Sequence, residues 1–232
     1  MEILPKDFVY LRIIDPTIVQ SVRYASEFNF VGTPINGYHS AEIILTKQAA
    51  EGLKAVQEVL KAYNYCLVVY DGYRPQTAVD HFISWSQDDD ISQKELYYPT
   101  IEKPDLFKGY IAKKSGHTRG STVDLTIIEL GKSLHPIEEK DITLASGERI
   151  KFLDDGSVDM GSSFDMLHPV SHHDTDLIPQ ECLDKRNFLR KTMEESGFKA
   201  YSKEWWHYTL IDEPYPETYF DFPITACEAY EL

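Results

Sequence analysis

The chain has 232 residues, of which 42% are hydrophobic and 12% aromatic, a composition typical of a globular protein with a buried core and not of a disordered chain. Its formal net charge is −15, from 23 basic and 38 acidic residues, and the basic residues do not cluster. We therefore expect neither a nucleic-acid partner nor binding to an anionic membrane surface. The sequence contains no stretch of about 18 apolar residues that would span a membrane.

The N-terminal residues and the cysteines suggest a compartment. The start of the chain, MEILPKDFVYLRIID, carries charges throughout and lacks the apolar core of a signal peptide. The three cysteines, Cys66, Cys182 and Cys227, form no CxxC pair and are too widely spaced for a disulfide framework. We expect a cytoplasmic protein, or a periplasmic one if a leader was removed.

The first half of the chain alternates strands and helices. In chain order we expect an early strand over 8–14, a short strand over 41–45, a helix over 47–63, an apolar strand over 65–70 and a helix over 76–85. Thr46 is placed to cap the first helix. The buried face of that helix is expected to hold five aliphatic residues, Ala50, Leu53, Val56, Val59 and Leu60.

The second half of the chain is richer in strands. Residues 86–110 are polar and contain two prolines, so we expect a long surface excursion. Beyond it we expect a strand that ends at 128, a hairpin over 142–153, a helix over 186–196 that ends at Gly197, and strands over 198–201 and 205–211. Helices at both ends with strands between them predict an α+β fold, a central mainly antiparallel sheet flanked by helices, in a single domain over residues 1–232.

Residues 115–126, SGHTRGSTVDLT, combine a histidine flanked by glycines with a carboxylate on a strand. Val123 and Leu125 alternate with polar residues, which predicts a half-buried strand with Asp124 on the opposite face. His117 lies on the glycine-rich approach to this strand. An imidazole beside a strand carboxylate suits a divalent metal ion.

The sequence Glu-Trp-Trp-His at residues 204–207 offers the other half of a metal site. His207 follows bulky apolar residues, where an unpaired histidine would be costly. With His117 and Asp124 it would provide two nitrogens and one oxygen, the three-ligand set of a catalytic zinc that keeps a position for water. Glu204 is expected in the turn before the last strand, from where a carboxylate could act as general base on that water.

Arg74 leaves a tight Asp-Gly turn at the end of the strand over 65–70, and Pro75 fixes the chain after it. An arginine is always charged and binds carboxyl and carbonyl oxygens, so near a metal ion it would stabilise an oxyanion. A purely structural arginine paired with Asp71 is equally compatible with the sequence.

A second group of histidines is a rival metal site. His168, His172 and His173 lie close together in the sequence, but adjacent histidines on a loop point in different directions and no spaced partner is evident. We do not expect them to bind metal. Each histidine and carboxylate of the first site also has an ordinary alternative, as a surface, capping or solvated loop residue.

Several motifs follow one another along nearly the whole chain. They are Arg23-Tyr24-Ala25, NFVG (29–32), YDGYRP (70–75), SGHTRGSTVDLT (115–126), MGSSFD (160–165), SHH (171–173), EWWHY (204–208) and the tail DEPYPETYFDFP (212–223). In this order they resemble the VanX-type D-alanyl-D-alanine dipeptidases, zinc enzymes of the Hedgehog/D,D-peptidase fold. The chain departs from the family motif at Thr122, where alanine is common, and this side chain is expected to point away from the metal.

The resemblance implies roles for named residues. One zinc ion (Zn2+) per chain would be bound by His117, Asp124 and His207, with Glu204 as general base and acid and Arg74 stabilising the transition state. The substrate would be D-Ala-D-Ala or a similar small D,D-dipeptide. Its pocket would be lined by Ser115, Tyr24 and Asp165, with Asp165 near the free ammonium group, and Tyr38 and Asp71 are further candidates.

Two other functions stay open. One is a D,D- or L,D-carboxypeptidase or cell-wall endopeptidase of the same fold, which acts on longer peptides and needs an open cleft. The other is a zinc-stabilised Hedgehog-like binding module without turnover, against which the presence of both Glu204 and Arg74 argues. The family serves glycopeptide resistance as well as recycling of wall-derived D-alanine. The sequence predicts neither which of these roles applies nor an oligomeric state. We expect the aromatic tail to pack on its own core.

Overall fold

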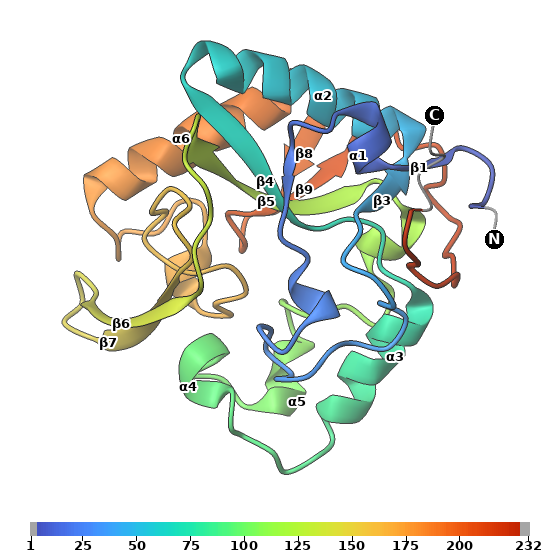
Figure 1. The fold of residues 1–232 in the computed structure, drawn as a ribbon. Coiled ribbons are helices and arrows are strands. Elements are labelled where there is room, and N and C mark those ends of the chain that lie inside the picture. Colours follow the sequence, from blue (N-terminus) through green and yellow to red (C-terminus); the bar gives the residue numbers. More distant parts are fainter. Residues whose placement is uncertain (1–3, 228–232) are drawn as a thin grey trace.

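A five-stranded sheet forms the centre of the fold in the computed structural model, which describes residues 4–227 (Figure 1). The strand order is β2 (Val19–Gln20), β4 (Tyr65–Asp71), β5 (Thr122–Glu129), β9 (His207–Leu210) and β8 (Phe198–Ala200). The first pair is parallel and the other three pairs are antiparallel. The predicted α+β architecture with a mainly antiparallel sheet is therefore confirmed.

Two long helices, α2 (Lys47–Ala62) and α6 (Gln180–Glu195), lie side by side on one face of this sheet (Figure 1). The side chain of Thr46 caps α2 by accepting a hydrogen bond from the backbone N–H of Ala49, as predicted. The prediction that Val59 is buried is wrong, because it is 43% exposed. Gln57 is buried instead, since its amide is satisfied by the backbone of β4 and of the loop before β2.

Three further helices, α3 (Gln76–Trp85), α4 (Lys94–Tyr97) and α5 (Lys103–Leu106), lie on the side of the sheet opposite α2 and α6 (Figure 1). The last two belong to residues 86–110, which we expected to be a surface excursion. That expectation is only partly right, because the segment buries three of its apolar side chains, Tyr97, Tyr98 and Leu106. The helical turns α4 and α5 give these side chains a common direction into the core.

The remaining elements are short. They are β1 (Phe8–Tyr10), α1 (Leu11–Ile14), β3 (Ile44–Thr46), the hairpin β6 (Glu138–Thr143) and β7 (Arg149–Asp154), and 3-10 turns at Arg23–Ala25, Gly116–Arg119 and Pro169–Ser171. The expected strand over 8–14 is thus interrupted after Tyr10. β1 pairs with only three residues of β3, and beyond them the chain turns helical. The last long helix also begins six residues before the expected start at 186.

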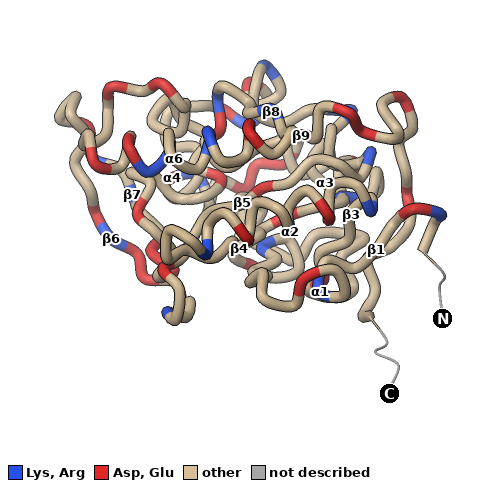
Figure 2. The backbone as a smooth tube through the Cα atoms, turned by 90° about the horizontal axis from the view of Figure 1, so that it is seen from above, with Lys and Arg blue, Asp and Glu red and all other residues tan. Residues whose placement is uncertain are grey.

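Strand β5 is buried on both faces, so the half-buried strand predicted from its alternation is wrong. Val123 and Leu125 face the core beneath the helices, and Asp124 alternates with them as expected. The polar face of β5 is covered by segments from other parts of the chain. No helix within residues 4–227 is long and apolar enough to cross a membrane. Figure 2 shows acidic and basic residues interspersed along the described chain rather than gathered in a basic stripe.

Candidate active site and metal centre

The three predicted metal ligands come together where β5 and β9 pair. Asp124 on β5 and His207 at the start of β9 are directly opposite each other in the antiparallel register. Opposite residues of a strand pair point to the same face of a sheet, so these two side chains meet. His117 comes from the 3-10 turn Gly116–Arg119, which enters β5 through Gly120 with a φ of +83°.

The donor atoms of these residues form a small triangle. His117 Nε2 is 3.2 Å from Asp124 Oδ2 and 3.3 Å from His207 Nδ1, which in turn is 3.0 Å from Asp124 Oδ1. In a tetrahedral zinc site with bonds of about 2.0–2.1 Å, ligand atoms lie about 3.3 Å apart. Asp124 Oδ1 is buried and accepts no well-directed hydrogen bond from the described residues. A zinc ion fits this donor set and would satisfy that oxygen.

The orientation of His117 is fixed from behind. Its Nδ1 lies 2.8 Å from the backbone carbonyl oxygen of Gly72 and donates to it, which leaves the Nε2 lone pair directed at Asp124. Such outer contacts orient metal-binding imidazoles. A side chain at position 72 is disfavoured, because a Cβ there would lie 2.8 Å from the carbonyl oxygen of Ile44. Because the YDGYRP motif has a glycine here, the backbone can approach Ile44 and place its carbonyl where it accepts the hydrogen bond from His117.

The electrostatics favour the protonation states that bind metal. Burial by itself would raise the pKa of Asp124, but the charge and hydrogen bonds that His117 and His207 provide when protonated outweigh it and hold that pKa well below its usual range. Burial lowers the pKa of His207, which favours the neutral form of its ring. An ionised carboxylate and a neutral imidazole are the forms in which these side chains are ligands.

Glu204 lies in the turn before β9, as predicted, with its carbonyl accepting a hydrogen bond from the N–H of His207. Its side chain is buried, and Oε2 is 3.4 Å from His207 Nδ1. Burial raises the pKa of Glu204 well above its usual value, and the negative charges of Asp124 and Asp165 add to this rise. A carboxyl group beside the metal position with a raised pKa is suited to accepting and returning a proton.

Arg74 pairs with Asp71, which agrees with its structural reading, and also lies beside the predicted metal ligands. Its Nε donates to Asp71 Oδ2 at 2.9 Å, and its Nη2 lies 3.4 Å from Asp124 Oδ2. The guanidinium carbon lies 4.9 Å from the centre of the Tyr24 ring. Among the described residues no hydrogen bond is made by Nη1, so these N–H donors are free for an oxygen in the pocket.

A pocket of about 460 Å³ opens above these groups. Eight predicted site residues line it, namely Tyr24, Arg74, Ser115, His117, Asp124, Asp165, Glu204 and His207. Two others do not: Tyr38 and Asp71 lie behind Arg74, where the Tyr38 hydroxyl donates to Asp71 Oδ1 at 2.7 Å. They hold the arginine instead of lining the cavity, because Arg74 itself occupies the space above them.

Asp165 lies at one side of the pocket in a left-handed conformation, with a φ of +60°. It accepts a hydrogen bond of 2.8 Å from the hydroxyl of Tyr24. Burial raises the pKa of Asp165 to about 8, and the charge of Asp124 contributes to the rise. A buried carboxylate without a cationic partner is stabilised by a ligand that brings a positive charge.

The sequence did not reveal the residues that cover the pocket. Segment 107–112, including Tyr110, lines the pocket together with Tyr201. The Tyr201 hydroxyl donates to the carbonyl of Gly109 at 2.7 Å, and its ring centre lies 5.6 Å from that of His207. Segment 107–112 lies largely in the presumed surface excursion, so only its aromatic residues and its proximity to the SGHTRG motif hinted at this position.

The rival histidines are used elsewhere. His168 Nε2 lies 3.5 Å from Glu148 Oε2, and His172 Nε2 lies 3.1 Å from the Tyr110 hydroxyl. His173 is buried among other side chains. Within residues 4–227, converging metal-binding atoms are found at the group formed by His117, Asp124 and His207, and the three loop histidines are not part of it.

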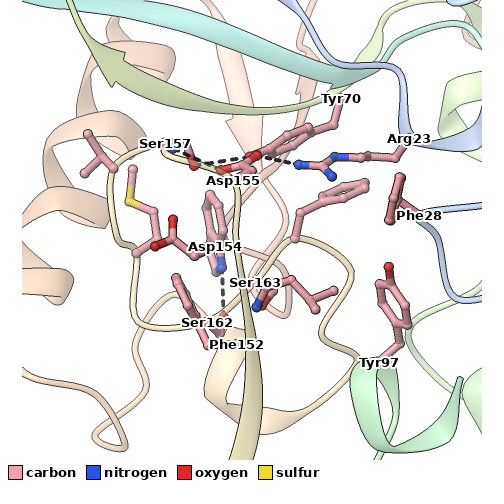
Figure 3. Close-up of a pocket in the computed structure, with 15 residues that line it drawn as sticks. Arg23, Phe28, Tyr70, Tyr97, Phe152, Asp154, Asp155, Ser157, Ser162 and Ser163 are labelled. Atoms are coloured by element: carbon pink, nitrogen blue, oxygen red, sulfur yellow. Dashed lines mark hydrogen bonds and ion pairs between the residues drawn. The ribbon is translucent and has the colours of Figure 1, made fainter. Parts of the chain in front are cut away.

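A second, smaller cavity is lined by residues that include Arg23, Tyr70, Asp155 and Phe164 (Figure 3). There Arg23 forms an ion pair with Asp155, which also accepts a hydrogen bond of 2.7 Å from the Tyr70 hydroxyl. The cavity measures about 20 Å³, which is room for about one water molecule. Its charges are already paired, so it has the character of a structural network. The Tyr70 ring stacks on Phe164 at 4.6 Å and thereby supports the loop that carries Asp165.

Known proteins resemble this chain over nearly its full length. A family profile described as D-ala-D-ala dipeptidase, of the M15 peptidases, matches residues 5–136 and 138–225. A D-alanyl-D-alanine dipeptidase of Enterococcus faecalis is 44% identical over 205 residues, which cover 88% of this chain and 91% of the relative. Enzymes of the same name from Enterococcus faecium (40%) and Streptomyces coelicolor (39%) each align with 94% of this chain and 98% of their own length.

A likeness to a solved structure is weaker. The vancomycin resistance D,D-pentapeptidase VanY, solved in complex with Zn(II), matches with a TM-score of 0.40 and 13% identity, over 75% of this chain and 76% of VanY. The family profile and the curated relatives confirm the resemblance expected from the motifs. The chain belongs to the D-Ala-D-Ala dipeptidase family of the M15 peptidases.

Proposed function

We propose that this protein is a zinc dipeptidase that hydrolyses D-Ala-D-Ala, or a similar small D,D-dipeptide, to free D-amino acids. The observation that carries this function is the triangle of donor atoms from His117, Asp124 and His207, 3.0 to 3.3 Å apart, in a pocket with a buried acid and a buried arginine. Membership of the M15 peptidases, which are zinc enzymes, supports it.

His117 and His207 would hold the metal through neutral nitrogens and Asp124 through a carboxylate oxygen. Zinc bound there would polarise the scissile carbonyl and lower the pKa of a water molecule. The charge of Asp124 compensates one of the two positive charges of the ion. The contact from His117 Nδ1 to Gly72 keeps the first imidazole oriented for this role.

Glu204 is proposed as the general base and acid. Its Oε2 is close to the metal ligands, so it would accept the proton of the attacking water and then deliver it to the nitrogen of the leaving D-amino acid. Burial keeps water away from this carboxyl and raises its pKa, which favours the return of the proton in the second step.

Arg74 is proposed to stabilise the oxyanion that develops on the scissile carbonyl. Asp71 and Tyr38 hold the guanidinium in place from behind, so its free Nη1 donors are preorganised for an oxygen in the pocket. A donor of this kind is fixed before the reaction starts. It therefore stabilises the transition state without reorganisation.

Asp165 is proposed to bind the ammonium group of the dipeptide, with the Tyr24 hydroxyl orienting its carboxylate. An ammonium in this buried place would supply the missing counter-charge. Ser115 lines the same pocket, but its Oγ also accepts a hydrogen bond from the N–H of His117. We therefore assign Ser115 two roles: it caps the turn that carries His117, and it contacts the substrate.

The test is hydrolysis of D-Ala-D-Ala by zinc-loaded protein, with Glu204→Gln as the matched variant. We expect release of D-alanine by the wild type and a decrease of roughly 10²- to 10⁴-fold in the variant. Glu204→Gln should still bind one zinc ion. Wild-type protein that binds zinc but releases no D-alanine from small D,D-dipeptides would overturn the proposal. Hydrolysis of longer peptides alone would favour a carboxypeptidase instead.

We further propose a cytoplasmic location. The free thiols of Cys66 and Cys182 are buried, and Cys227 is free as well, which suits a reducing compartment. Measured distribution between cell fractions tests this proposal.

A further inference from the structure

We propose that residues 213–224, the C-terminal segment after β9, fix the relative positions of two turns, the one at Gly116–Arg119 that carries His117 and the one that carries Arg74. Glu213 and Asp221 would be the positioning residues. The inference rests on the proposed zinc dipeptidase function. No residue of this segment lines the pocket, yet its contacts fall on the backs of the turns that carry site residues.

The first contact fixes the turn of His117. Arg119, the last residue of the 3-10 turn Gly116–Arg119, forms a two-pronged ion pair with Glu213, with Nε to Oε2 and Nη2 to Oε1 both at 2.8 Å. The two side chains are only 17% and 10% exposed. A forked and largely buried pair of this type holds one geometry, whereas an exposed pair contributes little.

The second contact joins two turns through one residue. The backbone N–H of Phe220 donates to the carbonyl of Thr118 at 3.0 Å, and the Phe220 carbonyl accepts from the N–H of Gln76 at 3.2 Å. Thr118 follows His117 directly, and Gln76 lies two residues after Arg74. One residue of the segment therefore spans the distance between the metal ligand and the oxyanion donor.

The third contact caps the helix that starts behind Arg74. Helix α3 has Pro75 at its N-cap, which offers no side-chain acceptor. Asp221 takes this role from outside the helix: Oδ1 accepts from the N–H of Thr77 at 2.8 Å and Oδ2 accepts from the Thr77 hydroxyl at 3.0 Å. A carboxylate at a helix N-terminus also interacts favourably with the helix dipole. The helix start, and hence Arg74, is held by this residue.

Two more residues of the segment, Phe222 and Ile224, make further contacts of this kind. The Phe222 ring stacks on Tyr73 with centres 4.0 Å apart, and its N–H donates to the Tyr73 hydroxyl oxygen at 2.8 Å. Beyond it, the N–H of Ile224 donates to the carbonyl of Gly37 at 2.8 Å, beside Tyr38, which supports Asp71. The segment thus touches in sequence the turns at 118, 76, 73 and 37.

The two carboxylates act on different parts of the site, and this makes the proposal specific. Glu213 is linked through Arg119 to the ligand His117, so its loss should act on metal affinity. Asp221 is linked through the start of α3 to Arg74, so its loss should act on the rate of turnover. A segment that merely stabilised the fold would not separate these two effects.

The experiment compares Glu213→Gln and Asp221→Asn with Glu217→Gln, a matched control on an exposed residue of the same segment. Zinc affinity is measured by competition with a chelator, the ligand field by the visible spectrum of the Co(II) form, and turnover with D-Ala-D-Ala. We expect Glu213→Gln to weaken zinc binding about tenfold and to change the Co(II) spectrum, as outer-contact substitutions do. We expect Asp221→Asn to lower kcat about tenfold with KM and zinc affinity within about twofold of the wild type.

Arg119→Lys provides a second variant, because it keeps the charge but loses the fork. It should weaken zinc binding in the same direction as Glu213→Gln, and the double variant should be no weaker than the stronger single one. Wild-type zinc affinity in Glu213→Gln together with wild-type kcat in Asp221→Asn would overturn the proposal, as would equal losses in Glu217→Gln. A wild-type protein without dipeptidase activity would instead refute the function, and the zinc and Co(II) measurements would still test the Glu213 half.

Discussion

Replacing His173 with leucine is expected to flatten the dependence of stability on pH. His173 is 1% exposed, and neither ring nitrogen has a hydrogen-bond partner among the described residues. Its ring packs edge-on against Tyr208, with centres 5.9 Å apart. Burial, together with the positive charges of Arg190 and Arg186, lowers its pKa to about 4.

The sign and size of the effect follow from linkage. A histidine in the unfolded chain has a pKa of about 6.5, so folding disfavours the protonated form of His173. The stability from this group is fully present above about pH 6.5 and is lost as the pH falls toward about 4. The difference of about 2.5 units corresponds to about 3 kcal/mol, of which about 2 kcal/mol is already lost at pH 5.

The assay is urea unfolding of metal-free protein at pH 7, 6 and 5. Chelation removes the contribution of metal release, and the wild-type loss of stability minus the variant loss isolates the one imidazole. We expect His173→Leu to lose about 2 kcal/mol less than the wild type between pH 7 and pH 5. His39→Leu, on an exposed residue, is the control. Parallel curves for wild type and His173→Leu would refute the reasoning, because they would mean that burial does not disfavour the protonated ring.

Three further predictions concern the site and one helix cap. Asp124→Asn should retain less than a tenth of the zinc of the wild type after dialysis, measured by elemental analysis, and unchanged zinc content would contradict the ligand assignment. Arg74→Lys should lower kcat for D-Ala-D-Ala about 10²-fold with a smaller change in KM, as expected for a preorganised oxyanion donor, and an effect confined to KM would argue for a binding role. Thr46→Ala should lower the free energy of unfolding by about 1 kcal/mol because it removes the cap of α2, and thermal unfolding measures this loss directly.

The convergence of His117, Asp124 and His207 was predictable because their signals are local. The alternation around Asp124 indicates the face to which its side chain points, and the turn before His207 places Glu204 on the same side. What alternation does not report is what covers the polar face. Asp124 is buried because distant segments close over β5, so the half-buried strand was wrong while the direction of the side chain was right.

The errors at other positions have a similar cause. The apolar pattern of α2 predicts Val59 on its buried face, yet Val59 is exposed and Gln57 is buried, because backbone groups of neighbouring segments satisfy its amide. The lining contributed by Tyr110 and Tyr201 depends on the contact between segment 107–112 and the turn before β9. No local pattern in a single sequence reports contacts between residues so far apart in the chain. Tyr38 belongs to the same class, because its role is to support Asp71 from behind.

The pairing of Asp124 with His207 also makes the metal site depend on the correct docking of the last strand. Strand β9 follows α6 near the end of the chain, and a shift of one residue against β5 would turn His207 to the other face of the sheet. Until β9 has paired in this register, the growing chain offers only His117 and Asp124 and lacks the complete ligand set. Binding of a metal ion by all three residues therefore requires β9 to be paired in this register, and a bound ion would in turn stabilise that register.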